Sequence, residues 1–393
     1  MPAFMDMIAD SGMIRGMLPL LNRCGQSVAP LLLADRIAGA RFKSRALRRS
    51  TISMSLPFFV LAGSIWLYRS AIPSWFPAVY LLAYAVFFCL HGVNETSYST
   101  VQGKLIPVVW RGRLAAVSNT IGSLVAVCLA WWLLGTWLQV GGPEAFAKIF
   151  LFVGSVMFSA SLATLLLQER ADAAPGPRIR RRQHFREASG RIRQDAVLRG
   201  LCLIAGMFVF SQLLFPHYQR LGLELPGAEP VLLMDWVIAQ HLGAAAFSNI
   251  AGQMADRLGT RAALRLLTAA AACAPLLALG LAWWAPLKWY CLAFFWIGVI
   301  PVTLRMQVNY LLEIVARSEH PSYISTMGLC MALPFLLSPL IGAMVQWFGF
   351  TPPFLFVAGI VSVAAFRTWT MPEPRHFGSP PAEPAPDPDL TPR

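Results

Sequence analysis

Charged side chains are scarce in this sequence. Asp, Glu, Lys and Arg make up 13% of its 393 residues, about half their usual share in a soluble domain. Hydrophobic residues make up 56%, and the mean hydropathy is +0.57. This composition excludes an ordinary soluble protein and favours a chain built for lipid.

The motifs of common energy-converting and hydrolytic enzymes are absent as well. No G-x-x-x-x-G-K-[ST] loop occurs, so the sequence does not predict an ATP-driven pump. Neither H-E-x-x-H nor G-x-S-x-G occurs. All seven cysteines fall in apolar stretches, without a C-x-x-C pair or a histidine at metal-ligand spacing. We therefore expect no enzyme activity, no cofactor and no bound metal.

Long apolar runs recur along the whole chain. Each is long enough to cross a hydrocarbon core of about 30 Å as a helix, and none alternates as barrel strands do. Backbone polar groups in lipid must be satisfied within the segment, which requires helices. The sequence predicts an all-α membrane protein with about eleven transmembrane helices, near residues 13–34, 52–68, 76–99, 114–138, 146–167, 198–216, 231–254, 263–285, 288–312, 323–346 and 351–370.

Lysine and arginine alternate between the connections. Residues 35–50, 104–113, 170–199 and 257–265 hold six, three, nine and three of them, whereas the intervening connections hold one or none. This positive-inside pattern places the C-terminus in the cytoplasm and the N-terminus outside a cell (inner) membrane. The net charge of +13 is then explained by topology and by contact with anionic lipids, and we expect no nucleic-acid partner.

The hydrophilic stretches divide the chain into parts. Residues 168–199 form a basic interruption, which we interpret as a cytoplasmic linker between an N-terminal bundle (1–167) and a C-terminal bundle (200–371). The tail 372–393 is rich in Pro, Ala and Asp, and we expect it to be disordered.

The two bundles repeat a short motif. Leu-Ala-Asp-Arg-Ile at 33–37 ends the first span, and Met-Ala-Asp-Arg-Leu at 254–258 ends the seventh. The second copy resembles the signature G-x-x-x-D-[RK]-x-G-x-[RK]-[RK] of the major facilitator superfamily, while the first copy keeps only its Asp-Arg pair. This resemblance implies two pseudo-symmetric bundles around a central substrate cavity, with alternating access to its two sides. The family has twelve helices and places the first signature after its second helix, so the chain resembles the family without its first helix.

Polar residues deep within spans are costly in lipid and are therefore candidates for the cavity. His91, Asn94 and Glu95 share one face of a predicted helix. Glu95 beside His91 could hold and release a proton, and a structural ion pair of Glu95 is the competing interpretation. Two deep arginines, Arg23 and Arg305 (with Asn309 on the face of Arg305), leave a positive surplus that would suit a carboxylate or phosphate group. On the other half, further polar groups could face the cavity: Gln212, His217, Gln240, His241 and Asn249.

The signature residues have another role by resemblance, as cytoplasmic latches that form in one access state. We expect Gly252 to let a neighbouring helix approach and Asp256 to contact an arginine or a helix N-terminus across that approach. The competing interpretation is ordinary positive-inside charge. The latch candidates are Asp35, Arg36, Arg111, Arg113, Gly252, Asp256, Arg257 and Arg261.

Three function classes remain at this stage. The leading hypothesis is a monomeric secondary transporter that moves a small organic solute. In its most specific form, the solute is anionic and its transport is coupled to protons. A membrane receptor, or a transporter relative that has lost its cycle, is the second. An intramembrane enzyme is the third, and His91 with Glu95 offers it too few chemical groups.

Overall fold

The computed structural model describes residues 2–9, 11–38, 41–68, 72–106, 117–118, 121–122, 124–171, 189–315 and 319–374. Within these ranges every regular element is a helix. In the first half of the chain the elements are α1 (Pro2–Ile8), α2 (Gly12–Ala38), α3 (Lys43–Leu67), α4 (Phe76–Leu105), η1 (Ala130–Leu134), α6 (Gly135–Val140), α7 (Gly142–Ala163) and η2 (Thr164–Leu166).

The second half begins after residue 188. Its elements are α9 (Ala196–Leu213), α10 (Phe215–Leu223), α11 (Leu232–Leu258), α12 (Thr260–Trp284), η3 (Leu287–Tyr290), α13 (Cys291–Ile297), α14 (Val299–Ile314), α15 (His320–Ala332), η5 (Leu333–Leu337), α16 (Ser338–Phe348), α17 (Thr351–Arg367) and η6 (Thr368–Thr370). The all-helical architecture that the apolar runs predict is confirmed.

Eight helical segments of the described chain are long and apolar enough to cross a membrane. Two further predicted spans correspond to α2 and α11, each 27 residues long. Both fall outside those eight because polar residues lower their mean hydropathy, such as Asn22, Arg23 and Gln26 in α2. The predicted span 114–138 is described only in part, so the number eleven stays a prediction.

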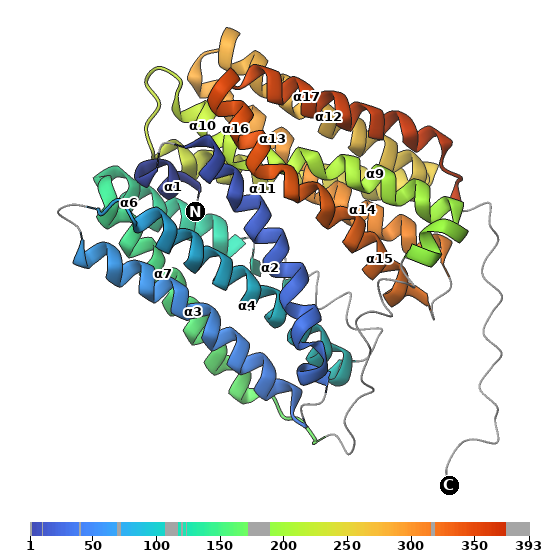
Figure 1. The fold of residues 1–393 in the computed structure, drawn as a ribbon, viewed down its shortest axis with the longest axis horizontal. Coiled ribbons are helices and arrows are strands. Elements are labelled where there is room, and N and C mark those ends of the chain that lie inside the picture. Colours follow the sequence, from blue (N-terminus) through green and yellow to red (C-terminus); the bar gives the residue numbers. More distant parts are fainter. Residues whose placement is uncertain are drawn as a thin grey trace.

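Each half encloses its own cluster of buried apolar side chains. One cluster joins α1 to α4 and α7, with Phe4, Tyr80 and Phe150 in ring contact at its centre. The other joins α9 to α17 and includes Trp236 stacked on Phe294. Figure 1 shows the two helical groups meeting along α2 and diverging away from it.

The halves converge tightly at the end of the molecule where α2 begins and α16 ends. A Cβ added at Gly12 would lie 2.3 Å from the Gly342 carbonyl oxygen, and one at Gly16 would lie 2.5 Å from that of Ser338. Only glycine permits this backbone approach. The Gly12 amide also donates to the Gln346 side chain at 3.1 Å. We call this region the converged end.

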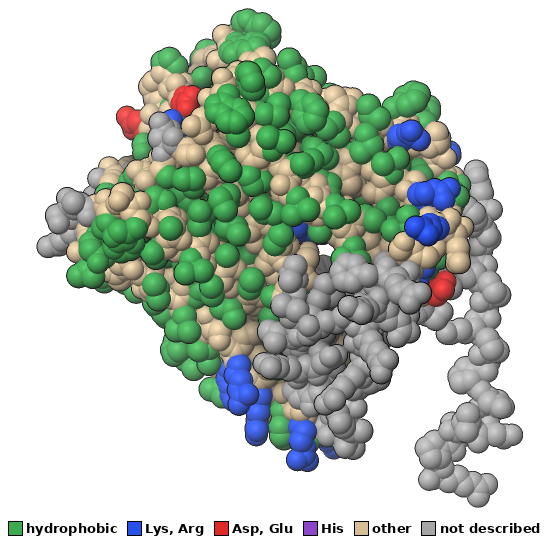
Figure 2. Space-filling model, viewed as in Figure 1, with side chains coloured by type: hydrophobic (Ala, Val, Ile, Leu, Met, Phe, Trp, Pro, Cys, Tyr) green, Lys and Arg blue, Asp and Glu red, His purple; other side chains and the backbone are tan. Residues whose placement is uncertain are grey.

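The opposite end carries the basic groups. In Figure 2, Lys and Arg side chains gather on both halves at the end away from the convergence. Helices α3 and α12 begin at this end, and helices α4 and α17 finish there. The charge alternation read from the sequence thus separates the two ends of the fold, and we call this second region the basic end.

Candidate functional site

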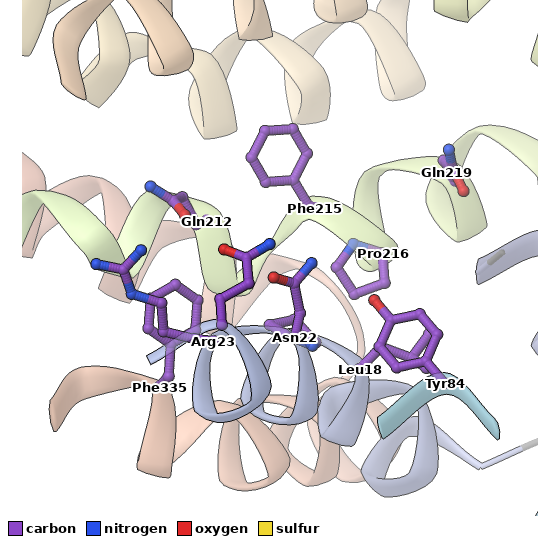
Figure 3. A pocket seen from close by; sticks show the side chains of 11 residues that line it. Leu18, Asn22, Arg23, Tyr84, Gln212, Phe215, Pro216, Gln219 and Phe335 are labelled. Atoms are coloured by element: carbon purple, nitrogen blue, oxygen red, sulfur yellow. The ribbon is translucent and has the colours of Figure 1, made fainter. Parts of the chain in front are cut away.

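A cavity of about 280 Å³ lies between the halves, next to the converged end. Helix α2 contributes one wall, and α9, α10 and η5 contribute the other, with Tyr84 of α4 at one side. Figure 3 shows Asn22 and Arg23 of α2 directed toward Gln212 and Phe215 of the second half. The lining residues are Leu18, Pro19, Asn22, Arg23, Gln26, Tyr84, Gln212, Phe215, Pro216, Gln219 and Phe335.

Proline interrupts the helices at this depth. Pro19 lies inside α2, Pro216 occupies the first turn of α10, and Pro334 lies in the short 3-10 helix η5. Proline has no N–H, so Pro19 removes one backbone hydrogen bond within α2, while α9 and α15 end just before Pro216 and Pro334. Interrupted helices expose backbone polar groups in the membrane interior, where they can serve a binding site.

Arg23 is the single charged side chain of the described cavity wall. Its guanidinium carbon lies 5.9 Å from the centre of the Phe335 ring, a cation–π contact. Its Nε is buried and has no hydrogen-bond partner among the described atoms. No Asp or Glu of the described part of the chain lines the cavity. The site therefore presents a positive charge that the wall itself does not neutralise.

Amides and aromatic rings make up most of the remaining wall. Asn22 contacts the Tyr84 hydroxyl, and the side-chain oxygen of Gln219 is buried without a partner in the described structure. Phe215 and Phe335 give apolar surface on the side of the second half. This arrangement can bind a small anion through Arg23 and bind the rest of the molecule through amide hydrogen bonds and ring contacts.

The predicted cavity residues on α4 lie beyond this pocket. His91 and Glu95 follow Tyr84 by seven and eleven residues, so all three share one face of α4. Glu95 is exposed, about 16 Å farther toward the basic end at 1.5 Å per residue. His91 stacks on Phe87 of its own helix. Asn94 instead accepts hydrogen bonds from Ser50 and Thr51 of α3, each at 2.8 Å, and therefore joins two helices within the first half.

The predicted pair on α14 is also outside the described pocket. Arg305 and Asn309 are exposed on one face of α14, which contributes no lining residue. Of the eleven polar residues that the sequence suggested for the cavity, the structure places Arg23 and Gln212 in the pocket. The polar residues that sequence reasoning did not single out are Tyr84 and Gln219. Tyr84 is a polar group inside an apolar run, whereas Gln219 lies beyond the predicted span 198–216, where no such pattern could identify it.

The latch candidates fall into three groups. Arg111 and Arg113, and the side chains of Asp35 and Arg36, lie outside the described residues. Asp256 and Arg257 are exposed at the last turn of α11. A Cβ at Gly252 would meet no atom of the described residues within 4 Å, so the close approach expected there stays a prediction.

A carboxylate that the sequence did not suggest holds the basic end of the first half together. Glu169, just beyond η2, accepts the backbone amides of Lys43 and Ser44 at the start of α3, each at 2.8 Å. It also binds the Lys104 ammonium at 2.7 Å, and its side chain is 2% exposed. Burial by itself raises the pKa of Glu169, but Lys104 and the α3 amides outweigh burial and hold that pKa at about 2.

The second half has an equivalent contact. Glu373, just beyond η6, packs on Gly259 at the start of α12, and its carboxylate lies 3.5 Å from Arg261. A neighbouring Arg261 nitrogen donates to the Met371 carbonyl oxygen at 3.0 Å. Arg261, predicted as a latch between halves, is therefore paired within its own half here. Each acid follows the last span of its half.

Comparison with known proteins gives the fold. No protein-family model and no curated protein matches the chain. Among solved structures, a D-xylose–proton symporter is 15% identical with a TM-score of 0.64, over 93% of this chain and 89% of that chain. The nucleoside transporter NupG is 14% identical with a TM-score of 0.63, over 93% and 91%. An auto-inhibited POT family peptide transporter is 12% identical with a TM-score of 0.62, over 92% and 88%.

Proposed function

We propose that this chain, which has the fold of the major facilitator superfamily, is a secondary transporter that moves a small organic anion. The fold itself is shared with sugar, nucleoside and peptide transporters. The observation that carries the proposed substrate class is Arg23, a partly buried cation in the inter-half cavity without a carboxylate in the described wall. A carboxylate or phosphate on the solute would supply the missing charge.

The geometry supports alternating access as the mechanism. The halves contact each other closely at the converged end and diverge toward the basic end (Figure 1). Under the positive-inside rule, the basic end faces the cytoplasm of a cell membrane and the converged end faces outside. The solute would then reach Arg23 from inside in this state, and from outside after the halves separate at the converged end. We propose that Asp256 and Arg257 contact the first half in that second state, and that the protein acts as a monomer.

Proton coupling is part of the proposal. His91 and Glu95 lie on the face of α4 that bears Tyr84, and Glu95 is exposed toward the basic end. A proton on Glu95 would remove a negative charge. That charge otherwise attracts Arg23, or repels an anionic solute on its way from the basic end to the cavity. A receptor or an inactive relative, the alternative class, would bind the anion at Arg23 and release it on the side from which it came.

The test begins with binding. The purified protein is screened by thermal shift against matched sets of monocarboxylates, phosphate monoesters, neutral sugars and nucleosides. We expect stabilisation by one anionic set, and about tenfold to hundredfold weaker binding in Arg23→Gln, from the loss of a charge-assisted hydrogen bond worth about 1.5–3 kcal/mol. Arg220→Gln, at a partly exposed arginine paired with Glu224, is the matched control with unchanged binding.

Transport is then measured in proteoliposomes with an imposed pH gradient. Uptake of the anion that depends on the gradient supports the transporter, and binding without uptake favours the receptor. Stabilisation by neutral solutes alone, with wild-type affinity in Arg23→Gln, would overturn the anionic substrate and leave the fold assignment intact.

A further inference from the structure

Three ionisable side chains are buried together at the converged end. Arg15 of α2 donates from Nε to the Asp6 carboxylate of α1, and their side chains are 4% and 6% exposed. His217 of α10, which belongs to the second half, is 0% exposed. Arg15 is the charge that acts on the His217 ring. The transport proposal uses none of the three.

His217 lacks hydrogen-bond partners in this packed state. Both ring nitrogens, Nδ1 and Nε2, are buried without a partner among the described atoms. A neutral imidazole carries one donor and one acceptor, and leaving both unmade costs free energy that water would restore. The packed arrangement is therefore unfavourable at His217, and separation of the halves would relieve it.

No other ionised group of the elements known to pack on α10 lies at this position. Asp6 of α1 is bound to Arg15 and borders the Tyr80 phenol. On α10 itself, Arg220 pairs with Glu224. On α2, Arg23 lines the cavity described above, nearer the basic end than Arg15. The remaining described side chains are exposed, are uncharged phenols or thiols, or lie at the basic end: Cys24 (α2), Asp235, His241, Asp256 and Arg257 (α11), Lys288 and Tyr290 (η3), Tyr218 (α10), Arg199 and Cys202 (α9), Arg261, Arg265 and Cys273 (α12), and Arg367 (α17).

We infer that His217 is a proton-binding site that water reaches only when the two halves separate at the converged end, so that proton binding drives this separation. In the packed state an imidazolium would place a second positive charge beside Arg15, and its N–H groups would have no acceptor among the described atoms. In the separated state water solvates the imidazolium. A proton that binds one state better shifts the equilibrium toward that state by the same factor.

The consequence is a gate at the converged end that acidity opens. If that end faces outside, as proposed above, an acidic exterior favours the outward-facing state, and the proton must leave before the halves close again. Proton release from His217 would thereby be tied to closure over a bound solute. The inference rests on the proposed alternating-access function, but the separation itself can be measured without a solute.

The test measures the distance between the halves as a function of pH. Spin labels are attached to Trp75→Cys and Phe348→Cys, two exposed positions on opposite halves, in a background in which the seven native cysteines are replaced. Double electron–electron resonance is recorded from pH 8 to pH 5. Below the titration midpoint we expect the ratio of separated to packed protein to rise up to tenfold per pH unit.

Two substitutions assign the effect. In His217→Gln the ratio should be independent of pH, whereas His320→Gln, at the start of α15, should keep the wild-type response. In Arg15→Gln the imidazolium would face the Asp6 carboxylate instead of a cation, so the response should flatten or reverse. A merely structural His217 would not make the pH response depend on Arg15.

Three results would overturn the inference: no pH response in the wild type, a wild-type response in His217→Gln, or a wild-type response in Arg15→Gln. Because the measurement needs no solute, failure of the transport proposal leaves its outcome interpretable. Should His217→Gln fail to fold, the wild-type and Arg15→Gln profiles still decide the matter.

Discussion

Replacing Glu169 by glutamine removes a charge from the basic end of the first half while keeping its shape. The carboxylate accepts the amides of Lys43 and Ser44 and binds Lys104. Its pKa falls from the ordinary 4.5 to about 2, and each pKa unit corresponds to about 1.4 kcal/mol. The charged form thus stabilises the folded state by an upper value of about 3 kcal/mol. Glutamine keeps one acceptor, so we expect a loss of about 2 kcal/mol.

The assay is amide hydrogen exchange at the first turn of α3. A loss of about 2 kcal/mol corresponds to roughly thirtyfold faster exchange of the Lys43 and Ser44 amides at pH 7. Glu144→Gln, in the first turn of α7 at the converged end, is the matched control with unchanged exchange at these positions. Exchange within threefold of wild type in Glu169→Gln would refute the reasoning.

The same carboxylate predicts a pH dependence of defined sign. A depressed pKa contributes stability above the unfolded value and loses it as pH falls through the folded value. Protection of the α3 amides in the wild type, corrected for intrinsic rates, should therefore decline between about pH 4.5 and pH 2. Glu169→Gln should show no decline in this window.

Three other outcomes can be tested. Gly342→Val should hold the halves apart at the converged end, because a Cβ there would lie 2.0 Å from the Gly12 carbonyl oxygen. Spin-label distances between the halves would show this separation. Gly359→Val is the control, because a Cβ at Gly359 meets no described atom within 4 Å. Asp256→Asn should slow transport severely with solute affinity within a few fold, and parental rates would reduce Asp256 to a surface charge. Cysteine labels at positions 180 and 224 should be accessible from opposite sides of the membrane, and labelling of both from outside would overturn the proposed orientation.

The fold could be predicted from sequence because its determinants are local. Span length and unbroken apolar character specify helices in lipid regardless of what surrounds them. The repeated Asp-Arg motif supplied the family resemblance. Helices α2 and α11 contain more polar residues than the other spans. They still form, because their charged residues occur near the ends or face the space between the halves.

The site was only partly predictable because it depends on helix rotation and on breaks. Arg23 was identifiable as a charge deep in a span. Tyr84 and Gln219 are common polar residues whose orientation follows from the packing of α4 and the break before α10. Glu169 and Glu373 lie outside the apolar runs, and their partners are far away in the chain, so no local pattern reveals them.

The position of Glu169 in the chain bears on biosynthesis. Its amide partner Lys43 precedes it by 126 residues, so the start of α3 lacks its acceptor until the last span of the first half has been synthesised. Glu373 stands in the same relation to the start of α12. Both acids therefore emerge from the ribosome at the moment when a complete set of helices is available to pack. A nascent chain halted before residue 169 would leave these α3 amides exposed at the membrane surface, where quality-control proteases can distinguish an unfinished half from a finished one.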